Sequence, residues 1–176
     1  MYENIKIETV EEECQLCEDY AKKNLSEHPK VAILSCEGAC SRGEISRLAA
    51  NLVAHRLSQD KTVRICLGGA FTKNAGQRNL VKNASKVISI EGCFIDCASR
   101  MMKGVIPDLK ALVVQADSLY DIDLPFGINE VSEDILKKCA TKVAETIVKE
   151  YIEGNCKTDI KPSSKCCNKD LKSCCE

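Results

Sequence analysis

Between residues 30 and 100, cysteines gather at three places in the chain. Cys36 and Cys40 form one pair, Cys66 stands alone, and Cys93 and Cys97 form a second pair with the same spacing. Thiolates are soft ligands that suit zinc, Cu(I) and iron–sulfur clusters, and a thiolate activated by its surroundings is also a nucleophile. The chain holds 13 cysteines but only two histidines, so a metal site in it would be almost entirely sulfur.

The composition favours a metal-binding or redox role for these thiols over a disulfide framework. At 176 residues, 44% of them hydrophobic, the chain is large enough to bury a core without covalent staples. The cysteine count is odd, and the polar start lacks the apolar stretch of an export signal, so we expect a cytoplasmic protein. The net charge of −1 is made of scattered charges of both signs, and no apolar run is long enough to span a bilayer. We therefore expect neither nucleic acid nor a membrane as a partner.

Alternating strands and helices predict that the three cysteine loops share one edge of a sheet. Apolar runs at 31–34, 62–67, 87–90 and 110–115 predict strands, and helical stripes separate them. This alternation predicts an α/β fold: a single three-layer domain with a mainly parallel four-stranded sheet in the order 2-1-3-4, plus an N-terminal helix. Cysteines follow or close each of the first three strands, whose carboxyl ends meet at one edge, where ligands bind.

Some of these cysteines also lie near expected helix starts, because Cys36 and Cys40 stand just before Ser41. Ser41 and Glu44 have the spacing of a capping box, which predicts that Ser41 is the N-cap of the helix after Cys40. The next crossover helix is expected to begin at Cys93. Unpaired N–H groups and the helix dipole favour an anion at such positions, so we expect lowered thiol pKa values there.

The chain resembles the DGC-domain proteins, a family of candidate zinc-binding proteins that is named for an Asp-Gly-Cys signature and has no settled biochemical activity. The resemblance covers about residues 30–115 and rests on three motifs in order: Cys36-Glu-Gly-Ala-Cys40-Ser-Arg-Gly43, Cys66-Leu-Gly-Gly, and Glu91-Gly92-Cys93-Phe-Ile-Asp-Cys97-Ala98.

The resemblance implies a set of zinc ligands. It assigns Cys36, Cys40, Cys66 and Cys93 to the metal, with Cys97 as the next candidate. Glu91 departs from the signature, because it stands where the family has an aspartate and its side chain is one methylene longer.

The first hypothesis for function is a soft-metal protein, with zinc as the metal, that acts as a carrier, sensor or accessory protein without catalysis of its own. An iron–sulfur protein is one alternative. A thiol enzyme is another, because Cys36 and Arg42 have the C-x5-R spacing of low-molecular-weight tyrosine phosphatases and arsenate reductases. Persulfide or disulfide transfer through Cys36 or Cys93 belongs to the same alternative.

The remaining cysteines receive lesser roles. Cys14 and Cys17 lie on the apolar stripe of the expected N-terminal helix, which favours core packing. We expect an α/β metal-binding domain over residues 1–153 and a flexible cysteine-rich tail over 154–176. The tail carries two vicinal pairs that we interpret as accessory thiols able to capture metal or meet a protein partner: Cys166, Cys167, Cys174 and Cys175.

Overall fold

The computed structural model of the chain describes residues 8, 10–25 and 28–154. Its strands are β1 (Val31–Ser35), β2 (Thr62–Arg64), β3 (Lys86–Glu91) and β4 (Leu112–Gln115). Its α-helices are α1 (Gln15–Asn24), α2 (Ser41–Leu52), α3 (Gly76–Lys82), α4 (Cys97–Val105) and α5 (Glu133–Ile147). Short 3-10 or π-helical segments are η1 (Val53–Leu57), η2 (Gly68–Phe71), η3 (Ala116–Leu119), η4 (Ile128–Glu130) and η5 (Val148–Glu153).

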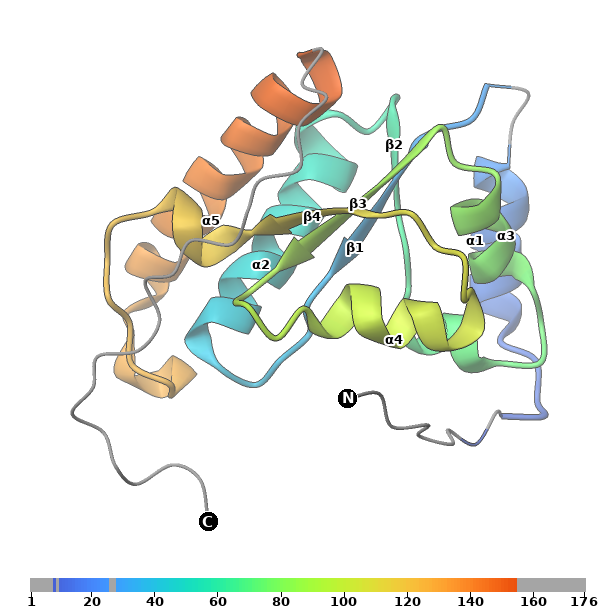
Figure 1. Cartoon of the computed structure of the whole chain (residues 1–176), viewed down its shortest axis with the longest axis horizontal. Coiled ribbons are helices and arrows are strands. Elements are labelled where there is room, and N and C mark those ends of the chain that lie inside the picture. The colour runs from blue at the N-terminus through green and yellow to red at the C-terminus, as the bar shows by residue number, and fades with distance from the viewer. Residues whose placement is uncertain (1–7, 9, 26–27, 155–176) are drawn as a thin grey trace.

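Two mainly apolar strands, β1 and β3, form the centre of the sheet. They pair in parallel, and Ile33, Leu34, Ile88 and Ile90 have no exposed surface. A strand covered on both faces is buried at successive positions, and β1 and β3 are buried from their second residue to their last. β2 pairs with β1 and β4 pairs with β3, all in parallel, so the structure confirms the α/β fold and the predicted order β2-β1-β3-β4 (Figure 1).

Side chains alternate along β1 and so divide the core into two layers. Ile33 belongs to the cluster that α2 and α5 cover, whereas Ala32 and Leu34 belong to the cluster on the other face, with residues of α1, α3 and α4. Figure 1 shows these two groups of helices on opposite sides of the sheet. No helix in the described part of the chain combines the length and apolar character that crossing a membrane requires.

The start of α2 differs from the prediction, because the N-cap is Cys40 and Ser41 is the first helical residue. The Cys40 sulfur accepts a hydrogen bond from the backbone N–H of Gly43, at 3.4 Å. The Ser41 hydroxyl donates instead to the carbonyl of Pro125, and its N–H donates to the carbonyl of Phe126. Ser41 therefore ties the loop before α5 to the carboxyl edge of the sheet, and a thiol performs the capping.

Gly92 allows the loop after β3 to pass directly over the start of α2. A Cβ placed on Gly92 would lie 2.9 Å from the carbonyl carbon and oxygen of Arg42 and from the backbone nitrogen of Gly43. Contacts of this kind cannot relax by rotating a side chain, since both partners are backbone. The cysteine loops after β1 and β3 can approach each other because position 92 has no side chain.

We expect Gly92→Ala to lower the free energy of unfolding by about 1–3 kcal/mol, since the added methyl forces backbone shifts in a packed region. Gly104 is the matched control, because it lies in α4 and a Cβ added there would have no atom within 4 Å. Gly104→Ala should stabilise the protein by about 0.5–1 kcal/mol through helix propensity. Urea unfolding under reducing conditions measures both, and equal effects of the two substitutions would contradict the close approach at Gly92.

Candidate functional site

Cys36 continues the backbone ladder of β1 and is buried at the carboxyl edge of the sheet. Its N–H donates to the carbonyl of Ile90 at 2.9 Å, and its side chain is only 4% exposed. The sulfur accepts a hydrogen bond from the N–H of Gly38 at 3.3 Å. The chain therefore turns back on itself directly after β1 and places backbone donors around the thiol.

Gly38 leaves room for two sulfurs in this loop. A Cβ on Gly38 would lie 3.2 Å from Cys36 Sγ and 4.0 Å from Cys40 Sγ. The sulfurs of Cys36 and Cys40 thus border the same small space, which any larger residue at position 38 would fill. Two neighbouring thiols that both accept backbone N–H groups are a suitable donor set for a soft cation.

Cys93 and Cys97 complete a group of four thiols, which we call the edge cluster: Cys36, Cys40, Cys93 and Cys97. Cys93 lies in the loop after β3, and Cys97 is the first residue of α4. A negative charge on Cys97 acts on Cys36, and charges on Cys40 and Cys36 act on Cys93. Four of the five predicted ligands therefore lie close enough for their charges to interact. They come from the segments that follow β1 and β3.

Burial outweighs the helix starts in setting the acidity of these thiols. Desolvation raises the pKa of Cys36 to about 11, although hydrogen bonding from Gly38 opposes the shift. Desolvation also raises the pKa of Cys93, with a smaller opposing effect from the backbone of Ile95. The expectation of a lowered pKa is wrong for Cys36 and Cys93, because removing a thiolate from water costs more free energy than hydrogen bonds from the nearby N–H groups contribute. For Cys93 the expected helix start is also wrong, since α4 begins at Cys97.

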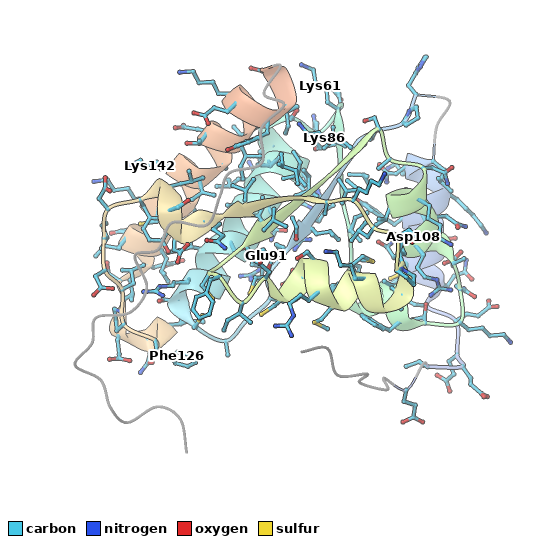
Figure 2. The ribbon with its side chains drawn as sticks, in the orientation of Figure 1. Lys61, Lys86, Glu91, Asp108, Phe126 and Lys142 are labelled. Atoms are coloured by element: carbon cyan, nitrogen blue, oxygen red, sulfur yellow. The ribbon has the colours of Figure 1, made fainter. Side chains whose placement is uncertain are left out.

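Glu91 has a structural role at this edge that the motif alone did not reveal. Its carboxylate is fully buried and accepts hydrogen bonds from the Ser89 hydroxyl and from the N–H groups of Ala98 and Ser99, at 2.7–3.1 Å. It thus satisfies donors in the first turn of α4 and fixes the helix that carries Cys97 (Figure 2). A single acidic residue at the end of an apolar strand was the available signal.

Cys66 lies against a different thiol. A Cβ on Gly69 would lie 2.7 Å from Cys17 Sγ and 3.3 Å from Cys66 Sγ, and Cys17 in turn interacts with Cys14. We call Cys14, Cys17 and Cys66 the α1 thiol cluster. Neither Cys14 nor Cys17 is buried. Cys139, in α5, is buried in the core cluster that α2 and α5 cover.

Arg42 and Tyr120 lie near the edge cluster. Arg42 makes an ion pair with Asp123, at 3.5 Å. The Tyr120 hydroxyl is buried and has no hydrogen-bond partner among the described residues, and the charges that act on it include those of Asp117, Arg42 and Cys40. A buried hydroxyl without a partner is costly, so this one is available to a water or a bound group beside Cys40.

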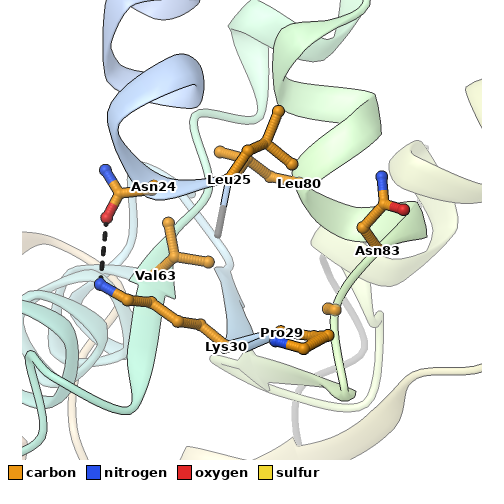
Figure 3. Close-up of a pocket in the computed structure, with 8 residues that line it drawn as sticks. Asn24, Leu25, Pro29, Lys30, Val63, Leu80 and Asn83 are labelled. Atoms are coloured by element: carbon orange, nitrogen blue, oxygen red, sulfur yellow. Dashed lines mark hydrogen bonds between the residues drawn. The ribbon is translucent and has the colours of Figure 1, made fainter. Parts of the chain in front are cut away.

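The described residues hold no preassembled metal site, and two of their cavities differ greatly in size. No group of three His, Cys, Asp or Glu side chains in residues 8, 10–25 and 28–154 stands in position to hold an ion. The cavity in Figure 3, where Lys30 bonds to Asn24, has a volume of about 20 Å³, room for one water. The second, of about 590 Å³, adjoins Cys17 and Cys66. The four predicted accessory thiols of the tail lie outside the described residues.

The fold and the edge cluster define a parallel α/β protein with thiols at the carboxyl edge of its sheet. A comparison with known families matches residues 32–123 to the DGC domain. The chain therefore belongs to the DGC-domain family, as its motifs predicted. Searches of curated proteins and of solved structures found no match.

We expect Glu91→Ala to lower the free energy of unfolding by about 3 kcal/mol, because three donors lose a buried charged acceptor. Glu91→Asp should recover part of that loss, since it keeps the charge but has a shorter reach. The control is Glu145→Ala on the exposed face of α5, which should change stability by no more than about 0.5 kcal/mol. Denaturant unfolding followed by circular dichroism checks all three, and a neutral Glu91→Ala would contradict the helix-fixing role.

The rate of alkylation of the metal-free protein tests whether the Cys36 thiol is protonated near neutral pH. A thiol with a pKa of about 11 is roughly one-thousandth thiolate at pH 8, so iodoacetamide should modify Cys36 slowly, and faster by about tenfold per pH unit up to pH 10. Cys14 is the internal reference, because hydrogen bonding from Cys17 lowers its pKa. Peptide mapping gives both rates. Rapid modification of Cys36 near pH 7 would support the C-x5-R nucleophile instead.

Proposed function

We propose that this DGC-domain protein binds a soft metal ion, zinc in the first place, at the carboxyl edge of its sheet. The ligands would be the four thiols of the edge cluster, and the protein would serve as a metal carrier, sensor or accessory factor. The observation that carries the proposal is the mutual proximity of Cys36, Cys40, Cys93 and Cys97, which come from two separate loops. Cys66, the fifth residue of the predicted ligand set, lies beside Cys17 and is not part of the proposed shell.

The surroundings of the cluster suit a cation better than a nucleophile. Burial raises the pKa of Cys36 and of Cys93 and so favours the neutral form of these two thiols in the absence of an ion. A divalent cation reverses that preference because it stabilises thiolate directly. Four thiolates complete a tetrahedral zinc shell and leave no open position, which fits binding rather than catalysis. Binding requires the thiols to rotate about their Cα–Cβ bonds, since no three ligands stand in position among the described residues.

The phosphatase-like alternative receives less support. A C-x5-R enzyme needs a thiolate nucleophile and an arginine directed at the substrate oxyanion. Here burial raises the pKa of Cys36, and Arg42 is paired with Asp123. The C-x5-R spacing of Cys36 and Arg42 also arises without an enzymatic role, because the loop after β1 leads directly into the N-cap of α2 at Cys40.

Metal analysis of protein purified without oxygen tests the proposal. We expect about one zinc per chain in the wild type and loss of most of it in Cys36→Ser, which removes a ligand at the centre of the cluster. Cys139→Ala is the matched control, because Cys139 is a buried thiol that packs in the core, and it should retain zinc. A full-length chain with serine at the four accessory positions of the tail should also retain it.

Three results would contradict the proposal. Wild-type protein that contains no metal would contradict the proposed binding function. Metal lost only when the tail thiols are replaced would move the site to the tail. A brown protein with visible absorbance and stoichiometric iron would replace zinc by an iron–sulfur cluster.

A further inference from the structure

The α1 thiol cluster joins two parts of the fold that the edge cluster does not use. Cys14 is the N-cap of α1, Cys17 lies in its first turn, and Cys66 follows β2. The Cys17 thiol lies within hydrogen-bonding reach of both Cys14 and Cys66. All three are free thiols.

Gly69 brings two of these sulfurs together. The 2.7 Å and 3.3 Å that would separate a Cβ at this position from Cys17 Sγ and Cys66 Sγ mean that both sulfurs face the same space. The Gly69 N–H also donates to Cys66 Sγ at 3.3 Å. A side chain at position 69 would push Cys17 away from Cys66.

One buried side-chain amide links the backbones of Cys17 and Cys66. Gln77, in α3, is 1% exposed. Its side-chain nitrogen donates to the carbonyl of Cys17 at 3.3 Å, and its side-chain oxygen accepts the N–H of Cys66 at 2.9 Å. Because the amide is satisfied at both ends, it fixes α1 against the end of β2 and keeps the sulfurs in place.

The larger cavity opens beside this thiol pair. Its volume of about 590 Å³ lies in the range of small-molecule sites, and its lining includes Cys17, Cys66, Tyr20, His55 and Arg64. Arg64 is held in place by Asn51 and Glu37, so one wall of the cavity is a fixed polar network. Two adjacent thiols on the wall of a small-molecule cavity suit a disulfide-containing ligand.

We propose that Cys17 and Cys66 form a redox-active dithiol that reduces small-molecule disulfides in this cavity. The Cys66 thiol loses its proton and attacks one sulfur of the ligand; a Cys66–sulfur bond forms, the ligand S–S bond breaks, and the departing thiolate takes up that proton. Cys17 then attacks Cys66 Sγ, a Cys17–Cys66 disulfide forms, and the second half of the ligand leaves with the proton from Cys17. Two electrons pass from the dithiol to the ligand.

Oxidised glutathione is the probe for this exchange, used on the full-length, reduced protein without oxygen. Peptide mapping of the wild type should show a Cys17–Cys66 disulfide and release of two glutathione thiols. Cys17→Ser should stop at the first step and accumulate glutathione on Cys66. Gly69→Ala should slow disulfide formation about tenfold or more by displacing Cys17, because small misplacements of reacting atoms are costly. Gly104→Ala in α4, which does not line this cavity and where no atom lies within 4 Å of a new Cβ, should leave the rate unchanged.

The controls separate this inference from the metal proposal. Cys36→Ser removes an edge-cluster thiol and should leave the Cys17–Cys66 disulfide intact, so each proposal can fail alone. The inference is overturned if Cys17 and Cys66 both stay reduced, if Cys17 joins Cys14 instead of Cys66, or if Cys17→Ser accumulates no glutathione on Cys66. Equal rates for Gly69→Ala and Gly104→Ala would also overturn it.

Discussion

The carboxyl edge of this protein depends on direct backbone contact between the loop after β3 and the start of α2. That contact excludes a side chain at Gly92 and brings the segments with Cys36 and Cys93 close together. Glu91, the residue before Gly92, is buried and accepts the first donors of α4. Adjacent residues therefore set both the approach of the loops, through backbone contact, and the position of α4, through one buried side chain.

Burial gives the edge cluster its chemical character. Thiols that are removed from water resist ionisation, whereas a thiol outside the core that accepts hydrogen bonds from a neighbouring thiol and from backbone N–H groups ionises more readily. Cys36 and Cys93 follow the first case, and Cys14, at the start of α1, follows the second. Cysteine side chains therefore differ in acidity within this protein: those of Cys36 and Cys93 have raised pKa values, and that of Cys14 has a lowered one.

The division of the cysteines into two clusters follows from the connection between β2 and α3. After β2 the chain passes through η2, and Gly69 in that segment lies against Cys17. α1 packs on α3 and, through Gln77, on the end of β2. Cys66 is thereby brought next to the N-terminal helix, while the loops after β1 and β3 bring the edge cluster together around α2 and α4.

The sequence by itself determined the sheet, its order and the edge at which cysteines collect. Continuous apolar runs such as 31–34 identify buried parallel strands, and the rules for crossover connections leave few possible strand orders. Only the tertiary structure decided which thiols are neighbours. The position of α1 is not constrained by a crossover between parallel strands, so its contact with Cys66 was not predictable from topology. The pKa values of Cys36 and Cys93 and the role of Glu91 depend on burial, which arises from packing between segments far apart in the chain.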